Sequence, residues 1–410
     1  MLKKLALLSL ACFVFAASAF AAEPVRIGAI YPLTGDVAAI GQNIKRGIDF
    51  AVEEINAKGG VAGRPLEIVW GDTQGDPKVG MSEAERLITR ERVSCLLGAY
   101  QSAVTEVISQ TAERYRTPFV TAISTANILT TRGYKYFFRL APTNMTFLKS
   151  MIGFVNEYNE QHLGGKLKTA AVVADNTLLG QETLEWSKYW CKEYGIEIVS
   201  EILYARGTPD LTSEVLALKS SGADFLIADN YISDCILLVK TMGEQNLLPV
   251  ITVGKATGFI DPTFIPNVGT LSNGITTALE WAPDMTNGAD TNLAFRAKYG
   301  IDMNGHSANA YTATWLLKTA IEQAGSTDKD AIRQALADIK ITKTFPNGGP
   351  DIILPYNEIE FVDVDLNGVQ HTNLNYNAIT AVAQIQDGKY VTVWPFDKTD
   401  AKVIYPAPYK

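Results

Sequence analysis

The sequence predicts an α/β protein of two lobes, each a parallel sheet covered by helices. Strand-like apolar runs alternate with helical patterns at least four times in the first 130 residues, and the same alternation restarts after residue 144. Such alternation is typical of parallel sheets with helices on both faces. The chain has 410 residues, too many for one hydrophobic core, so two lobes are expected.

The first 21 residues read as a secretory signal peptide. Lys3 and Lys4 precede an apolar stretch, and Ala19-Phe20-Ala21 has the A-x-A pattern of a cleavage site. Residues 9–11 before Cys12 make a poor lipoprotein box, so we do not expect a lipid anchor. Because no later apolar run approaches the roughly 20 residues needed to span a bilayer, we expect the mature chain to be soluble.

Charge and cysteine content narrow the function classes. The net charge is −8, and it becomes about −10 when Lys3 and Lys4 are removed with the leader. An acidic surface of mixed charge argues against a nucleic-acid partner. Cys95, Cys191 and Cys235 remain in the mature chain, and none has a CxxC partner, so we expect buried free thiols.

The first lobe begins with a buried strand at 25–31, followed by a helix that Gly59-Gly60 ends. A strand at 66–70 precedes a helix that runs from Pro77 to Thr89. Residues 94–131 add two short strands and the helical patterns that follow them.

A short strand at 136–140 leads to residues 141–144, where we place the first crossing between the lobes. The second lobe is predicted to contain helices 145–160, 180–194, 211–221 and 231–245 and strands 168–175, 196–204, 224–229 and 249–253. After a strand at 273–281, helices near 289–299, 307–324 and 329–338 should return to the first lobe. The tail from residue 355 reads as antiparallel strands with turns such as Asp387-Gly388, and two or three crossings would give a stiffer hinge than one.

Hydroxyl residues follow two neighbouring strands of the first lobe. Ser102 stands where a helix N-cap is expected, and Ser124-Thr125 end the next apolar run. The carboxyl ends of parallel strands share one rim, so Ser102 and Thr125, with their backbone amides, could hold one carboxylate between adjacent loops. The alternative is that both are ordinary N-caps.

Several segments together resemble the periplasmic branched-chain amino acid binding proteins. The matching residues are 27–35 (IGAIYPLTG), 51–67 (AVEEINAKGGVAGRPLE), Asp72, Asp76-Pro77, 98–102 (GAYQS), 132–134 and 138–139. The likeness spans nearly the whole mature chain and is strongest in the first 145 residues.

The resemblance implies a type I periplasmic binding fold, with two Rossmann-like lobes joined by a three-stranded hinge. On this basis the N-terminal lobe is expected to comprise 22–142 plus 277–355, and the C-terminal lobe 143–276 plus 356–410. It also implies a periplasmic monomer that delivers a small carboxylate-bearing solute to the membrane permease of an ABC importer. The cysteine positions of the disulfide common in that family are not filled here.

The resemblance also implies a ligand site. Ser102 and Thr125 match the residues that hold the ligand carboxylate, and the carbonyl of Ile123 matches one that faces the ligand ammonium. Tyr231 matches a tyrosine that closes over the ligand; without that match it could equally be a core tyrosine. The expected ligand-binding residues are Tyr100, Gln101, Ser102, Ile123, Ser124, Thr125, Leu179, Tyr231, Lys255 and His306.

Lys255 departs from the family pattern. Amino acid binders carry an acidic residue there, which pairs with the ligand ammonium, and a lysine would repel that group at a desolvated site. The ligand could therefore be an organic acid or carry a second anionic or carbonyl group. Alternatively, Lys255 reaches solvent or pairs with Asp234.

Catalytic and metal motifs are not found. The sequence contains no GxSxG, HExxH or GxxxxGK[ST] pattern, and His162, His306 and His371 are scattered, so neither a cofactor, a metal site nor an enzyme is predicted. Residues 363–368 imitate the start of a calcium loop, but Leu374 replaces its glutamate, which favours a β-hairpin turn. For the function of the whole protein, the alternatives to a solute receptor are an amide or urea sensor and, less favoured, an enzyme that uses the cleft between the lobes.

Overall fold

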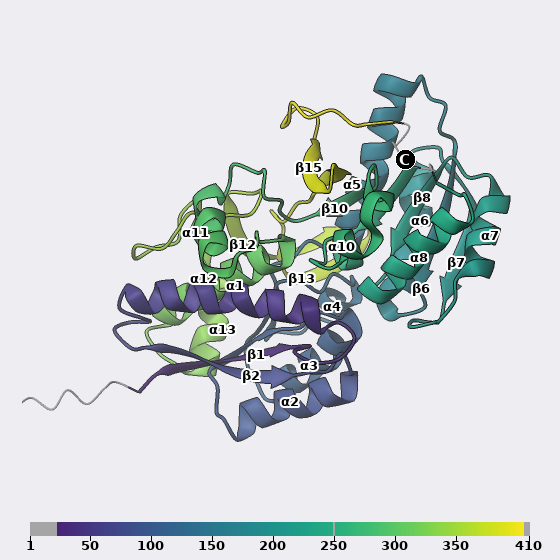
Figure 1. The fold of residues 1–410 in the computed structure, drawn as a ribbon. Coiled ribbons are helices and arrows are strands. Elements are labelled where there is room, and N and C mark those ends of the chain that lie inside the picture. The colour runs from purple at the N-terminus through teal and green to yellow at the C-terminus, as the bar shows by residue number, and fades with distance from the viewer. Residues whose placement is uncertain (1–22, 249–250, 406–410) are drawn as a thin grey trace, which may run out of the picture.

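The computed structural model describes residues 23–248 and 251–405, which form two lobes with one sheet each (Figure 1). The predicted signal peptide lies outside these residues, as do residues 249–250 at the start of a predicted strand. Both sheets are mixed and largely parallel, which confirms the predicted α/β class.

The first sheet has eight strands in the order β11-β12-β13-β5-β4-β3-β1-β2, and its core from β5 to β2 is parallel. Ile27 lies opposite Ile68 on one side and Cys95 on the other. The strands are β1 (Val25–Tyr31), β2 (Leu66–Asp72), β3 (Cys95–Gly98), β4 (Phe119–Thr121), β5 (Phe137–Arg139), β11 (Lys340–Thr342), β12 (Glu358–Leu366) and β13 (Val369–Asn375).

Helices from two distant parts of the chain cover this sheet. Helices α1 and α12 pack so closely that a methyl group at Gly47 would lie only 2.4 Å from the carbonyl oxygen of Ser307. As predicted, the three helices after residue 288 return to the first lobe. The helices are α1 (Ala38–Ala57), α2 (Pro77–Thr89), α3 (Ser102–Arg114), α4 (Ile128–Thr131), α11 (Ala289–Tyr299), α12 (Gly305–Ala324) and α13 (Lys329–Ala337).

The second sheet has seven strands in the order β15-β14-β10-β9-β8-β6-β7. Strands β7 to β10 run parallel, whereas β14 and β15 add an antiparallel edge. The strands are β6 (Thr169–Asp175), β7 (Glu197–Tyr204), β8 (Phe225–Asp229), β9 (Ile251–Lys255), β10 (Thr276–Leu279), β14 (Ala381–Gln386) and β15 (Lys389–Trp394).

The helices of the second lobe flank this sheet (Figure 1). Helix α5 continues into a π-helical turn, and a 3₁₀ turn follows α10. The segments are α5 (Asn144–Tyr158), the π turn (Asn159–Leu163), α6 (Leu178–Glu193), α7 (Thr212–Ser221), α8 (Ile232–Glu244), α9 (Ala256–Phe259), α10 (Phe264–Val268) and the 3₁₀ turn (Gly269–Ser272).

The chain crosses between the lobes in three places: between β5 and α5, between β10 and α11, and between β13 and β14. The predicted crossing at residues 141–144 is the first of these. This number of connections is what a three-stranded hinge requires.

The expected lobe boundaries need two corrections. Residues 356–410 were assigned to the second lobe, but β12 and β13 belong to the first sheet, where Leu374 pairs with Arg139 of β5. Only β14 and β15 of that segment join the second sheet. Strand β10 also belongs wholly to the second sheet, so the crossing follows Leu279 rather than residue 276.

Both tight turns of the tail are confirmed. Asn367-Gly368 joins β12 to β13 with φ of 53° and 80°, and Asp387-Gly388 joins β14 to β15 with φ of 49° and 73°. Positive φ at both central residues is the geometry of a two-residue hairpin turn. The calcium-like stretch at 363–368 is therefore the end of a strand and its turn. Within residues 23–248 and 251–405, no cluster of His, Cys, Asp and Glu side chains could hold a metal ion.

Candidate functional site

A small cavity lies between the two lobes, where the carboxyl ends of both sheets face each other. Ligand sites in open α/β sheets are typically found at this edge. The first lobe and α12 contribute Tyr100, Ser102, Ile123, Thr125 and His306, and the second lobe and its hinge strand contribute Phe147, Leu179, Tyr231, Lys255, Ala256, Thr257 and Glu280.

Eight of the ten expected residues line this cavity, and Gln101 and Ser124 do not. The hydroxyl of Ser124 instead donates to the carbonyl oxygens of Ala99 and Tyr100, at 3.0 Å each. Gln101 is buried and precedes α3. Neither residue therefore lines the cavity.

Ser102 and Thr125 do not cap helices, which contradicts the simpler interpretation. Ser102 is the first residue of α3, and its Oγ accepts the backbone N–H of Ala126 at 3.3 Å. Thr125 lies three residues before α4, and its Oγ1 accepts a hydrogen bond from Lys255 Nζ at 2.8 Å. The two hydroxyl loops are thus tied to each other and to the opposite lobe.

The side chain of Arg139 holds the loop that contains Thr125 in place. Its guanidinium donates to the carbonyl oxygens of Ser124, at 2.9 Å, and of Ala126. Burial lowers the pKa of this guanidinium to about 9. One buried side chain thus fixes the carbonyl groups on both sides of Thr125.

Lys255 is buried and pairs with Asp229, not with Asp234. Its Nζ lies 3.5 Å from Asp229 Oδ2, both side chains are 2% exposed, and the ammonium sits 5.2 Å from the centre of the Phe147 ring. Burial lowers the pKa of Lys255, while the charge of Asp229 opposes that shift. Asp234 instead accepts the backbone N–H of Gly207. Both sequence-based alternatives for Lys255, solvent exposure and pairing with Asp234, are therefore wrong.

Hydroxyl groups complete the environment of Asp229. Thr183 donates to Oδ2 and Thr257 donates to Oδ1, each at 2.6 Å. With these bonds and the nearby ammonium, the Asp229 carboxylate is fully engaged within the second lobe.

Three rings form one wall of the cavity. The ring centroid of Tyr100 lies 5.7 Å from that of Tyr231 and 5.4 Å from that of His306, both in edge-to-face arrangement. Burial, with a smaller effect of the Lys255 charge, lowers the pKa of His306 to about 3, so this ring is neutral at physiological pH. The wall offers an apolar surface with polar tips, as small-molecule pockets commonly do.

Comparison with known proteins identifies the family. A family model described as periplasmic binding protein matches residues 24–359. The chain belongs to this family. It is 30% identical over 408 residues to Leu/Ile/Val-binding protein homolog 7 of Brucella suis biovar 1 (strain 1330), with 96% of each chain covered. A homolog 8 from Brucella abortus (strain 2308) is 27% identical over 388 residues, with 92% of each chain covered.

Two solved structures show a fold similar to that of this chain. A leucine-binding protein from Thermotoga maritima matches with a TM-score of 0.74 and 22% identity, covering 91% of this chain and 99% of that chain. An ABC-transporter solute-binding protein from Rhodopseudomonas palustris BisB5, in complex with 3,4-dihydroxybenzoic acid, matches with a TM-score of 0.74 and 17% identity, covering 90% and 96%. The family assignment makes the chain a periplasmic binding protein and not an enzyme, and these comparisons give no support to an amide sensor.

This periplasmic binding protein is closed, because its lobes bond to each other directly across the cleft. Tyr100 donates to the carbonyl of Thr257 at 2.9 Å, and Arg206 forms a 2.6 Å ion pair with Asp36. The Arg206 guanidinium also covers the Tyr231 ring at 4.4 Å. Closure thus brings the aromatic wall, the hydroxyl loops and Lys255 around one enclosed space.

Glu182 of α6 makes a further contact between the lobes. Its carboxylate accepts the backbone N–H groups of Asn127 at 2.5 Å and Ile128 at 3.1 Å, at the start of α4 in the first lobe. Burial raises the pKa of Glu182, and these two bonds oppose the rise. The second lobe therefore supplies the cap that α4 lacks in its own sequence.

Sequence reasoning missed Phe147, Ala256, Thr257 and Glu280. Glu280 had a usable signal, because it is an acidic residue directly after the apolar strand β10, at the ligand-binding edge. Phe147 looks like any apolar residue of an amphipathic helix, and Ala256 and Thr257 lie in the short helix α9. In the part of the chain that the structure describes, no helix is both long and apolar enough to cross a membrane.

Proposed function

We propose that this protein is the periplasmic solute receptor of an ABC importer and that it binds a small carboxylate-bearing solute between its lobes. In this proposal Ser102, Thr125 and their backbone amides hold the carboxylate. The lobes then close over the solute, and the closed monomer docks on a membrane permease. The observation that carries the proposal is the contact of Lys255 Nζ with Thr125 Oγ1, which puts a buried cation at the expected carboxylate site.

The ligands of similar folds support a carboxylate as the shared feature. Structural neighbours are described in complex with isoleucine, leucine, benzoate and 4-hydroxybenzoate. These molecules differ in size, aromaticity and net charge, but each carries a carboxylate. A common anchor for that group, with a variable remainder of the pocket, accounts for this range.

In this mechanism, closure of the two lobes signals that a ligand is bound. A ligand shifts a two-state equilibrium only by its difference in affinity for the two states. Tyr231 and Lys255 of the second lobe can contact a ligand held by the first lobe only when the lobes are closed. The ligand therefore stabilises the closed form.

Removal of the two hydroxyls tests the site. Native mass spectrometry of the purified protein should release a bound small molecule, which is then identified and used in titration calorimetry. Hydrogen bonds to charged groups contribute about 1.5–3 kcal/mol each, so Ser102→Ala with Thr125→Ala should weaken binding by at least a hundredfold. Ser82→Ala with Thr89→Ala removes two exposed hydroxyls that bond only within α2, and this control should bind normally. Equal affinity of the two double variants would refute the proposed site.

A further inference from the structure

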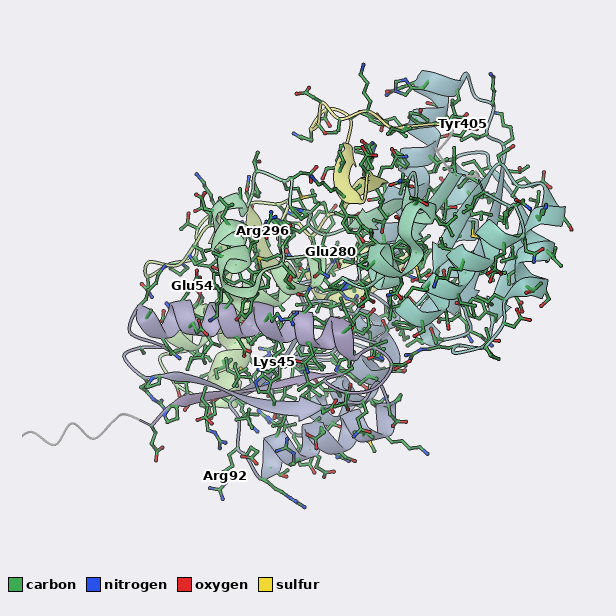
Figure 2. The ribbon with its side chains drawn as sticks, viewed as in Figure 1. Lys45, Glu54, Arg92, Glu280, Arg296 and Tyr405 are labelled. Atoms are coloured by element: carbon green, nitrogen blue, oxygen red, sulfur yellow. The ribbon has the colours of Figure 1, made fainter. Side chains whose placement is uncertain are left out.

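Glu280 is a buried carboxylate at the cavity wall, and one of its two oxygens has no donor in the described part of the chain. It follows β10, lines the cavity and is 2% exposed. Among the described residues, its Oε2 has no hydrogen-bond partner. Figure 2 shows Glu280 at the junction between the two lobes.

The other buried carboxylates of the cleft differ from Glu280. Asp229 receives two threonine hydroxyls, and Glu182 receives two backbone N–H groups. Buried polar groups in folded proteins are nearly always hydrogen-bonded, and exceptions call for an explanation. A carboxylate left open at the wall of a ligand cavity is suited to accept a hydrogen bond from the ligand.

Among the residues that the structure describes, the charged groups near Glu280 do not form an ion pair with its carboxylate. Lys255 lies near enough to lower its pKa, but that ammonium is already paired with Asp229 and bonded to Thr125. The Glu280 side chain also lies against Gly305, at the partly positive amino end of α12. The remaining titratable neighbours are His306, which is neutral, and the buried Tyr356.

We propose that Glu280 is a specificity-determining ligand residue, which accepts a hydrogen bond from the ammonium group of a zwitterionic ligand. The inference rests on the proposed function, since it assumes that the ligand carboxylate lies at Ser102 and Thr125. The cavity then holds two balanced pairs of charge: Lys255 with Asp229, and the ligand ammonium with Glu280.

This assignment revises the expectation drawn from Lys255 alone. A free lysine would repel an ammonium group, but a lysine paired with Asp229 presents little net charge to it. The acidic partner for the ligand is then supplied by the end of β10 in place of the end of β9. The ligand class is an amino acid rather than a simple organic acid.

Matched ligand pairs test the assignment. Titration calorimetry compares leucine with 4-methylpentanoate, phenylalanine with 3-phenylpropanoate, and alanine with propanoate, so that each pair differs only in the ammonium group. In at least one pair the amino acid should bind at least tenfold more tightly. Glu280→Gln, which keeps the shape of the side chain, should remove this preference, and Glu244→Gln at the exposed end of α8 should keep it.

The pH dependence gives a second readout. Burial raises the pKa of Glu280 to about 7. An ammonium ligand needs the ionised form, so its affinity should fall by up to tenfold per unit as the pH drops below 7. A deaminated ligand favours the protonated form, and its affinity should not fall in that range. The Glu280→Gln protein should lose the fall seen with the amino acid.

Three results would overturn the inference. The first is equal or tighter binding of the deaminated partner in every pair, and the second is an unchanged preference in Glu280→Gln. The third is that none of the six compounds binds. Each of these leaves the hydroxyl-loop site untouched. That site is tested separately, with the solute released from the native protein and the Ser102 and Thr125 variants.

Discussion

The ion pair between Lys255 and Asp229 lies in the most desolvated part of the site, with 3.5 Å between Nζ and Oδ2. Removal of one partner from a buried pair leaves an uncompensated charge and costs about 3–5 kcal/mol. Asp229→Asn is therefore expected to lower the free energy of unfolding by that amount in urea denaturation.

An exposed pair provides the control for this measurement. Lys188 and Glu201 are 2.7 Å apart, but their side chains are 49% and 42% exposed. Surface pairs contribute about 0–1 kcal/mol, so Glu201→Gln should change stability by less than 1 kcal/mol. If Asp229→Asn had an effect as small as this control, the pair would not be desolvated as described.

His371 couples stability to pH from within the first sheet. Its Nδ1 lies 2.8 Å from Thr130 Oγ1, and burial and the nearby Arg139 charge lower its pKa to about 4. The unfolded chain has an ordinary histidine pKa of about 6.5, so it binds a proton more readily than the folded chain does. The stabilisation is complete above pH 6.5 and is lost as the pH falls toward 4, by up to about 1.4 kcal/mol per unit.

Urea denaturation of His371→Gln at pH 7 and pH 5 measures this coupling. The variant should lose less stability between the two pH values than the parent protein does. His162→Gln, a change at an exposed position, should keep the parental difference. His306 contributes a similar slope in both proteins, since its pKa is also depressed. An identical pH response of parent and His371→Gln would contradict the prediction.

Position in the sequence indicated which residues would lie close together, but not which hydrogen bonds and ion pairs they would form. Ser102 and Thr125 follow adjacent strands of the first sheet, and Tyr231 follows a strand of the second sheet, so their positions at the ligand-binding edges were predictable. The partner of Lys255 was not, because Asp229 and Asp234 are both plausible by spacing, and only the pairing of β8 with β9 places Asp229 beside it.

At the scale of elements, α6 stabilises the short helix α4 in the opposite lobe. Glu182 accepts two backbone N–H groups at the start of α4 but does not line the cavity. Glu182→Ala removes these charge-assisted bonds from the closed form only. Loss of about 1.5–3 kcal/mol from closure should weaken ligand binding by about 10- to 150-fold.

The same helix offers the control. Glu185 is exposed and one turn further along α6, so Glu185→Ala should bind the released solute with parental affinity. Small-angle X-ray scattering should show a larger radius of gyration for unliganded Glu182→Ala than for unliganded Glu185→Ala. Closure would not depend on this contact if both variants behaved alike.

Most elements could be predicted because their hydrophobic periodicity is strong. The errors occur where periodicity does not decide the outcome. Alternating strands such as β12 and β13 can join either sheet, and the pairing of β13 with β5 is a tertiary choice that local sequence does not encode. Residues 256–272 form only short helical turns, which lack a clear repeat.

At the scale of the molecule, the contacts between the lobes in the closed form differ in burial and therefore in strength. Arg206 and Asp36 bond across the cleft, but Asp36 is 54% exposed. Such a pair adds little to stability and is screened by salt. We expect Asp36→Asn to weaken binding of the released solute less than fivefold in calorimetry, far less than Glu182→Ala. A larger loss in Asp36→Asn would mean that the cleft mouth, rather than α4, governs closure.

The three crossings mean that no single peptide bond is needed to keep the lobes together. In the third crossing, Tyr376 and Ile379 are exposed, while β13 and β14 on either side are paired in their sheets. A protease site inserted there should yield two fragments that still migrate as one particle in size-exclusion chromatography. The same position is a candidate for new chain ends in a circularly permuted receptor.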